Sequence, residues 1–452
     1  MSFEPTMDFV KSLEEAVATQ DTQSIRDTLK DMHAADISMV LDRMEADECR
    51  YILGLLHKEL SADVISELDE DTQREFLKSF EPVELAGYMD YTDSDDAADI
   101  LNLLPVKMKE EVIASMKNKE KVAHITDLLK YDEDCAGGLM AKELIKANIN
   151  WDIKQCIEEI RRQTKNVDKI LTVYVVDDMG MLQGRVSLKK IILSKDETLI
   201  KDISVPQVHV VQTYYEKEDV AEIMQKYDLE AVPVVNMQGK LLGRITIDDI
   251  VDVITEQAEM NQQMMSGLSE NVEEDDTVWM LSRARLPWLL IGMMGGLMGA
   301  QLMGFFEGDL ELVPAMAFFI PLITATGGNV GIQSSTLVVQ ALANPAAGLL
   351  GSSAGARLFK VFMVALINGL AISSIVFVFV IFFKGMSLAF TVSIALFCVV
   401  LLASFMGTIT PLLLDKLGIN PALASGPFIT TANDLLGLAV YFIIARVLMS
   451  AL

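Results

Sequence analysis

The sequence is poor in the residues that build disulfide frameworks and zinc sites. It has four cysteines and four histidines among 452 residues, and no two cysteines stand in a C-x-x-C spacing. This pattern excludes a disulfide scaffold and gives no indication of a structural zinc site. We therefore expect the cysteine-bearing soluble part of the chain to face a reducing, cytosolic environment.

Positive charge is also scarce, because 37 lysines and arginines face 64 acidic residues and the net charge is -27. Such acidity argues against nucleic acid as a partner and favours cations. A well-solvated acidic surface is the alternative interpretation. Residues 1–15 contain neither a basic stretch nor an apolar stretch, so we expect no cleavable signal and insertion directed by later segments.

The charge is distributed unevenly along the chain. From Leu286 to the end, five acidic residues balance five basic ones, so residues 1–285 carry the whole of the -27. The composition is 51% hydrophobic, which is typical of a chain with a membrane part. The sequence therefore predicts an acidic soluble half followed by a neutral membrane half.

The second half contains apolar segments near or above the roughly 20 residues that a spanning helix needs. Five are expected, at residues 287–306, 312–342, 358–383, 387–414 and 424–449. Arg283 and Arg285 precede the first segment, whereas Glu307, Asp309 and Glu311 follow it. The positive-inside rule then places the N-terminal half in the cytoplasm and the C-terminus outside.

One carboxylate, Asp434, stands inside the last apolar segment. A charge at the bilayer centre costs roughly 2.5 to 3.5 kcal/mol, so it favours a functional interpretation. A structural ion pair is the alternative, but the basic residues of this half lie toward the expected ends of the segments. Protonation of the carboxyl is a further alternative. We expect Asp434 to meet a cation.

The second apolar segment is interrupted by small and polar residues, among them Gly327, Gly328, Asn329 and Gln333. This pattern predicts broken backbone that lines a wet cavity, with close helix packing through small residues as the alternative. Since these segments offer only oxygen ligands, a hard cation such as magnesium, calcium or manganese is favoured. A two-fold dimer would bring two copies of Asp434 together.

The first half begins with residues that read as helix throughout, at 8–130, in short amphipathic units. A recurring Ala-Asp-aliphatic triplet at residues 35–37, 62–64 and 98–100 indicates a helical-repeat array. The densest acidic cluster of this array lies at residues 90–99.

Residues 140–256 contain an internal duplication, because the segment from Val173 aligns with that from Val232. Each copy predicts two strands joined by a glycine turn, at Gly180 and Gly239, with a second glycine opening the second strand. The pair resembles tandem CBS domains, β-α-β-β-α modules that bind adenine nucleotides in many proteins.

The expected nucleotide contacts differ between the two copies. The second copy has Thr246 and Asp249 at the phosphate and ribose positions, whereas the first has Ser187 and a lysine, Lys190, at these positions. Tyr174 remains as a base-stacking candidate. ATP binding by the pair is therefore one hypothesis, and a purely structural role for the pair is the alternative. After it, residues 277–286 read as a helix that ends at Pro287.

The whole order of segments, with GGNxGxQSST in the second span and PFITTxxD in the fifth, resembles the MgtE family of magnesium channels. The resemblance implies three kinds of region: an all-α helical-repeat N-domain, an α/β tandem CBS pair and an α-helical membrane domain of five transmembrane helices. The corresponding boundaries are 1–132 for the N-domain, 133–200 and 201–260 for the CBS domains, 261–286 for a connecting "plug" helix and 287–452 for the pore domain.

Residues matching the family's motifs carry roles that the resemblance implies. The pore group comprises Asp434, Thr430, Thr431, Asn329, Gln333 and Glu307. The cytosolic magnesium-sensor group comprises Asp95, Asp99, Glu216, Asp228, Asp248, Asp252, Glu256 and Glu259. The chain reads Gln-Ala-Glu-Met-Asn after Glu256, with fewer carboxylates than the family pattern, so fewer or weaker sensor sites are expected there.

The resulting hypothesis is a homodimeric magnesium channel or facilitative transporter of the cell membrane, without catalytic activity, which cytosolic magnesium closes. Cobalt and manganese are further candidate ions. One alternative is a divalent-cation carrier coupled to protons or sodium. Another is a membrane sensor that transports nothing and reports nucleotide levels through the CBS pair.

Overall fold

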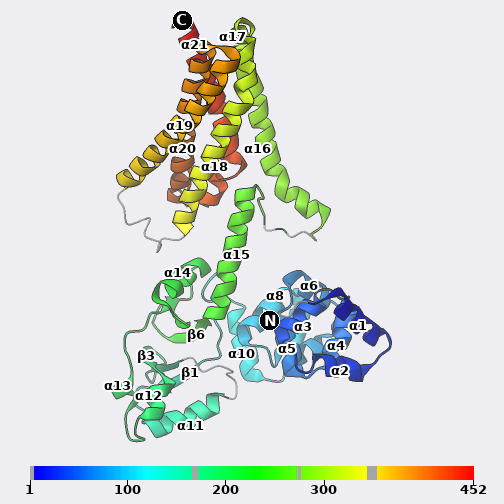
Figure 1. The fold of residues 1–452 in the computed structure, drawn as a ribbon. Coiled ribbons are helices and arrows are strands. Elements are labelled where there is room, and N and C mark those ends of the chain that lie inside the picture. Colours follow the sequence, from blue (N-terminus) through cyan, green and yellow to red (C-terminus); the bar gives the residue numbers. More distant parts are fainter. Residues whose placement is uncertain (1–4, 165–171, 271, 273–275, 344–353, 452) are drawn as a thin grey trace. The chain divides into compact units, whose positions relative to one another are not determined.

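The computed structural model describes residues 5–164, 172–270, 272, 276–343 and 354–451. Their contacts divide the chain into two compact units, Met1–Ile254 and Thr255–Leu452, which Figure 1 shows in sequence colours. Separate hydrophobic clusters stabilise each unit.

The first unit begins with an array of short amphipathic helices (Figure 1). They are α1 Met7–Ala18, α2 Thr22–Leu29, α3 Ala34–Leu41, α4 Ala46–Leu55, α5 Lys58–Ser66, α6 Glu70–Leu77, α7 Pro82–Met89, α8 Ser94–Asn102, α9 Val106–Ser115 and α10 Lys119–Leu128. The three Ala-Asp-aliphatic triplets lie on α3, α5 and α8, where Ile37, Val64 and Ile100 are buried. The repeated triplet therefore marks the core-facing side of the array.

A tandem α/β pair completes the first unit. Its elements are β1 Ile145–Asn148, α11 Ile153–Gln163, β2 Val173–Val176, β3 Leu182–Val186, α12 Leu188–Leu193, α13 Ile200–Ile203, β4 Val211–Gln212, α14 Lys217–Tyr227, β5 Ala231–Val235 and β6 Leu241–Thr246. In each copy the first strand pairs parallel with the second, and the second pairs antiparallel with the third. The predicted duplication is thus a repeated three-stranded sheet.

Glycine positions explain the two hairpins. Gly180 and Gly239 have φ values of +79° and +85°, which L-residues with a side chain rarely adopt, so both predicted turns are confirmed. Gly184 and Gly243 are the third residues of β3 and β6 rather than the first. A Cβ atom at Gly243 would lie 2.6 Å from the Ala141 carbonyl oxygen, so glycine is needed there for close backbone approach.

The connector between the soluble and membrane regions is not one helix at 261–286. Instead, α15 Ile247–Ser266 starts directly after β6, and eleven residues separate the end of α15 from the start of α16 Val278–Phe305. Gly267, at φ +86°, terminates α15, with the Leu268 N–H donating to the Gln263 carbonyl at 3.0 Å. This is the left-handed cap that ends many helices.

The second unit contains five helices long and apolar enough to cross a membrane, as predicted, among the residues described. Besides α16, its elements are α17 Glu307–Leu312, the 3₁₀ helix η2 Pro314–Phe319, α18 Ile320–Ala343, α19 Ala354–Lys384, α20 Met386–Lys416, the 3₁₀ helix η5 Pro421–Ala424 and α21 Pro427–Ala451. Helix α20 is the most buried of the five and packs against α18, α19 and α21.

Two expectations about these helices are wrong. Pro287 lies inside α16 and does not end it, and Pro411 likewise lies inside α20, since freed backbone groups of membrane helices find other partners. The second span is likewise continuous as α18, so the break expected there is absent from these residues. Its glycines serve close packing instead: Gly331 abuts Asn433 of α21, and its carbonyl oxygen abuts Gly407 of α20.

Candidate functional site

Asp434 lies on α21, a helix that begins at Pro427, three residues inside the expected span at 424–449. The residue is half-buried, and its side chain forms no hydrogen bond or ion pair within the described part of the chain. The basic residue of the same helix, Arg446, instead pairs with Asp309 at 2.6 Å. Among the described residues Asp434 therefore has no basic partner.

Asp434 lines a pocket of about 220 Å³ between α16, α18 and α21. Thr431 of α21 and Thr324 of α18 line the same pocket, and Leu435 and Leu438 complete the α21 side. The Thr324 hydroxyl donates to the Ile320 carbonyl at 3.1 Å, so its oxygen can still accept from water or meet a cation. At about 30 Å³ per water molecule, this space corresponds to about seven waters. One carboxylate, two hydroxyls and room for water suit a hydrated hard cation.

A row of glycines forms the α16 wall of this pocket, and the sequence reasoning missed it. Gly292, Gly295, Gly296 and Gly299 line the pocket at helical spacing. Gly295 directly abuts the Thr431 side chain, so a Cβ atom there would overlap it. The signal available in the sequence was four glycines spaced i, i+3, i+4 and i+7 within one span.

The other expected pore residues do not all gather at Asp434. Thr430 lies beside Gly328 and donates its hydroxyl to the Pro427 carbonyl at 2.9 Å. Asn329 and Gln333 share an exposed side of α18 and do not line the pocket. Glu307 is exposed at the start of α17 and is also outside it. Of the expected pore residues, the single chain brings together Asp434 and Thr431 in this pocket, and adds Thr324, which was not expected.

A second group of carboxylates joins α8 to the start of α15 within the first unit. The group comprises Asp95, Asp96 and Asp99 of α8 with Asp249 of α15, whose charges act on one another. Asp95 is only 9% exposed, and its buried Oδ1 atom has no hydrogen-bond partner. Sequence reasoning identified Asp95 and Asp99, missed Asp96, and assigned Asp249 to nucleotide.

Burial and mutual repulsion make this carboxylate cluster costly to ionise. Burial, followed by the charges of Asp96 and Asp249, raises the pKa of Asp95 well above its usual value. Asp96 and Asp99 retain solvent contact, yet the protein packed around them and neighbouring carboxylates raise the pKa of each to about 7. A bound cation would relieve this repulsion.

The donor set of the cluster suits magnesium, which is usually held by one or two carboxylates plus water. Among the described residues, no three His, Cys, Asp or Glu side chains are arranged around a common metal position. Asp95, with its orphaned buried oxygen, is the residue of the cluster that most needs a partner. The residues fit a hydrated ion bridging α8 and α15 better than a fully liganded one.

The remaining expected sensor residues are dispersed. Glu216 and Asp228 cap opposite ends of α14, about 18 Å apart at 1.5 Å per residue, so they do not share one ion. Asp248 and Asp252 lie one turn apart on α15, and burial together with the charge of Asp248 raises the pKa of Asp252. Glu256 and Glu259 lie further along the same helix.

The residues expected to bind nucleotide are largely engaged with the protein. Tyr174 is 1% exposed on β2, so its ring is not free to stack on a base in this arrangement. Ser187 caps α12 by accepting the Lys190 N–H at 3.3 Å. Thr246 donates its hydroxyl to Asp249 at 2.7 Å, which ties the second copy's pair to the start of α15.

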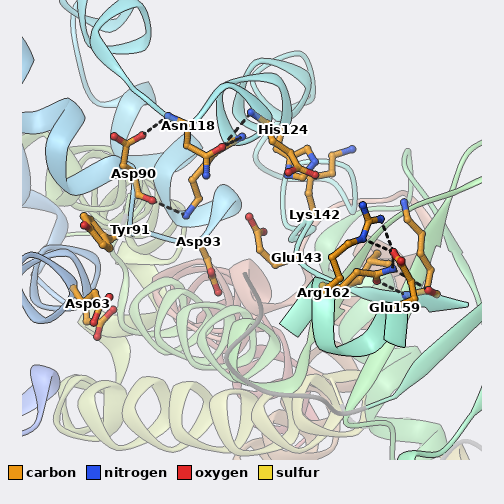
Figure 2. A pocket seen from close by; sticks show the side chains of 16 residues that line it. Asp63, Asp90, Tyr91, Asp93, Asn118, His124, Lys142, Glu143, Glu159 and Arg162 are labelled. Atoms are coloured by element: carbon orange, nitrogen blue, oxygen red, sulfur yellow. Dashed lines mark hydrogen bonds and ion pairs between the residues drawn. The ribbon is translucent and has the colours of Figure 1, made fainter. Parts of the chain in front are cut away.

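A charged cleft of about 580 Å³ opens between the helical array and the first α/β copy (Figure 2). Asp93 and Glu143 face it from one side and Arg162 from another. Several of its charges are already paired: Arg162 with Glu159, and Lys142 with Asp127 at 2.8 Å. The cleft is thus a water-accessible space between the helical array and the first α/β copy, lined mainly by charges that have partners within the protein.

The described residues combine five candidate membrane spans and a carboxylate pocket with a helical array and a tandem α/β pair. Family models match the chain in three places: "Divalent cation transporter" (MgtE) at residues 320–444, "MgtE intracellular N domain" at 32–134 and "CBS domain" at 200–256. The first α/β copy shares the topology of the matched second copy.

Curated relatives extend the match along the whole chain. The magnesium transporter MgtE of Thermus thermophilus is 34% identical over 450 residues, covering 97% of this chain and 98% of the relative. That of Enterococcus faecalis is 34% identical, covering 73% and 72%. The crystal structure of the cytosolic domain of the Mg²⁺ channel MgtE in complex with ATP matches at 31% identity and TM-score 0.51, covering 54% of this chain and 99% of that one.

The chain belongs to the MgtE family. Both the predicted family and the predicted fold class are confirmed, since the N domain, the CBS pair and the five candidate spans are all present. The family is one of transporters and channels, not of enzymes.

Proposed function

We propose that this chain carries magnesium across the cell membrane, down the ion's own gradient, past Asp434. The observation that supports the proposal is a carboxylate without a basic partner among the described residues, set in a pocket with hydroxyl groups and space for about seven waters. Relatives that match most of the chain are named magnesium transporters. Magnesium releases its waters reluctantly, so a wide, weakly liganding pocket suits its passage.

Dimerisation would complete the pathway. In a two-fold homodimer, Asp434 and its copy would supply two negative charges to one dication. Asn329 and Gln333, which are exposed in the single chain, would then be available to line a path shared between copies. With the first unit in the cytoplasm, the odd number of spans would place the C-terminus outside.

Cytosolic magnesium would regulate the same chain through α15. Asp249 at the start of this helix belongs to the carboxylate cluster. The last turns of α15 pack against the segment just before α21: Asn420 donates to Asn261 at 3.1 Å, and Gly426 approaches the Met265 carbonyl. Magnesium in the cluster would favour the compact state, and its loss would let the carboxylates separate. We place Asp95, Asp96, Asp99 and Asp249 in this sensor, with Asp248 and Asp252 as its neighbours.

Magnesium-dye measurements in proteoliposomes test the transport proposal. Influx should follow an imposed magnesium gradient without a proton or sodium gradient, and Asp434→Ala should abolish it. The matched control is Asp415→Asn, which neutralises an exposed carboxylate of α20 and should transport normally. Dependence on a proton or sodium gradient would favour the coupled carrier instead, and absence of flux in the unmodified chain would favour the sensor.

ATP binding is a second hypothesis, supported by the ATP complex of the related cytosolic domain and by the Thr246–Asp249 pair. Two features argue against it: Tyr174 is buried, and the first copy has Lys190 where the second copy has Asp249. Calorimetric titration of the full-length protein with ATP tests it, because Asp249→Asn should reduce any heat of binding if the carboxylate meets the ribose.

A further inference from the structure

The N-terminus of α8 lacks a capping side chain of its own. Asp93 occupies the N-cap position but makes no side-chain cap bond there. Instead, Glu143, which lies 49 residues later in the chain, accepts hydrogen bonds from the Ser94 backbone N–H at 3.3 Å and from the Ser94 hydroxyl at 2.6 Å. A carboxylate at this position satisfies an orphan donor and complements the helix dipole.

The contact is reciprocal and well enclosed. The Lys142 backbone N–H donates to the Ser94 hydroxyl oxygen at 3.0 Å. Ser94 is fully buried and Glu143 is 8% exposed. The Lys142 ammonium group binds Asp127 of α10 at 2.8 Å. Figure 2 shows Glu143 between Asp93 and Lys142 at the wall of the charged cleft.

The segment that carries Lys142 and Glu143 also forms hydrogen bonds to the second CBS copy. Ala141 exchanges two backbone hydrogen bonds with Arg244 of β6, at 2.8 and 2.9 Å. β6 leads directly into α15, where Asp249 begins the carboxylate cluster. Residues 141–143, which we call the strap, thus join the two elements that carry the clustered carboxylates: α8 through Ser94 and the start of α15 through Arg244.

We propose that Glu143 is a positioning residue, which caps α8 from the strap and so sets the distance between Asp95 on α8 and Asp249 on α15. The inference rests on the proposed inhibition by cytosolic magnesium, because its functional consequence is the concentration at which magnesium inhibits. Glu143 itself is not assigned as a ligand, since its carboxylate is already bonded to Ser94.

Two measurements on the full-length protein in lipid nanodiscs or proteoliposomes test this role. The first is hydrogen exchange of the α8 amides without magnesium; the second is the cytosolic magnesium concentration that halves transport. Glu143→Ala should speed exchange in the first turn of α8 about tenfold, in line with the loss of a cap, and should raise the half-inhibiting concentration several-fold. Transport at zero cytosolic magnesium should be unchanged.

Two further variants separate capping from charge. Ser94→Ala keeps the charge of Glu143 but removes the hydroxyl that bonds both Glu143 and Lys142, and it should reproduce most of the Glu143→Ala effect. Glu143→Gln keeps an acceptor and should fall between Glu143→Ala and the unmodified protein. Glu120→Gln, an exposed residue of the same cleft, is the control and should change neither measurement.

The outcomes are separable. Unchanged α8 exchange in both Glu143→Ala and Ser94→Ala would overturn the positioning role. A second combination of results would also overturn it. If magnesium inhibits Ser94→Ala normally but Glu143→Ala and Glu143→Gln lose inhibition equally, Glu143 acts through its charge alone. Absence of magnesium inhibition in the unmodified protein would overturn the proposed regulation, while the exchange measurement would still decide the capping role. If Glu143→Ala does not fold, Ser94→Ala carries the test.

Discussion

The proposed pathway in the membrane unit has one carboxylate, whereas the proposed sensor in the first unit has several. Asp434 stands with two threonine hydroxyls in a pocket of about 220 Å³, whereas Asp95, Asp96, Asp99 and Asp249 crowd together between α8 and α15. In a medium of low dielectric, a single charge attracts an ion over several ångströms. In contact with water and salt that attraction is screened, so more carboxylates are needed.

The two sites also differ in what a cation should change. A pathway must bind an ion weakly enough to release it, which favours few ligands and retained waters. A sensor must convert binding into a movement, which favours repulsion that the ion removes. The difference predicts that neutralising a carboxylate stops transport in one region and alters only regulation in the other.

The largest effect is expected from Asp434→Asn, which removes the charge but little volume. At 4 Å and an effective dielectric constant of 20, a unit charge pair is worth about 4 kcal/mol, so we expect magnesium flux to fall at least about a hundredfold. Asp434→Glu, which keeps the charge, should retain measurable flux in the same proteoliposome measurement. Equal loss in both variants would mean that the shape of the pocket matters more than its charge.

A smaller but still large effect is expected from Gly295→Ala. The added methyl group would overlap the Thr431 side chain, push α16 from α21 and distort the pocket, so we expect about a tenfold loss of flux, similar in free energy to overpacking a core by one methylene. Gly304→Ala is the control on the same helix, because its methyl group would meet no atom within 4 Å. Normal flux in Gly295→Ala would show that α16 and α21 can accommodate the methyl group without distorting the pocket.

The membrane site illustrates what the sequence could and could not predict. A charge inside an apolar segment, Asp434, is visible without a structure because its cost in lipid is so high. The α16 glycines could not be connected with it, because the contact between Gly295 and Thr431 joins segments 136 residues apart and depends on helix packing. The α18 glycines were read as a break, although in a membrane the same residues allow close packing.

The soluble unit gives a similar division. The glycine turns at Gly180 and Gly239 follow from local backbone conformation, so the two hairpins could be predicted from the sequence. The cap that Glu143 provides to Ser94 is non-local. The sequence around Asp93 gives no sign that a residue 49 positions after Ser94 caps α8. Asp249 was assigned from a nucleotide-binding pattern, but its neighbours on α8 depend on how the array packs against the CBS pair.

On the cytosolic side of the comparison, Asp99→Asn should leave flux unchanged when cytosolic magnesium is absent. The half-inhibiting magnesium concentration should rise about threefold, since one of several carboxylates is lost and pairs in contact with water contribute modestly. Flux measured at graded internal magnesium checks this. Asp36→Asn, in the corresponding triplet of α3, is the control. If Asp99→Asn lost flux even without internal magnesium, the carboxylate cluster would be needed for transport itself and not only for its regulation.

The smallest effect is expected at the end of α21 away from the connector. There the Arg446 guanidinium binds Asp309 at 2.6 Å and lies 4.6 Å from the Phe306 ring centroid, joining α21 to the segment after the first span. Because the Arg446 side chain is 56% exposed, the ion pair contributes about 0.2 to 1 kcal/mol. Arg446→Gln should therefore lower the thermal midpoint of the detergent-solubilised protein by only about 1 to 3 °C, with Lys416→Gln as the control. A loss of flux as large as that of Asp434→Asn, at nearly unchanged stability, would instead make this ion pair part of the ion pathway, and the membrane unit would no longer depend on a single carboxylate.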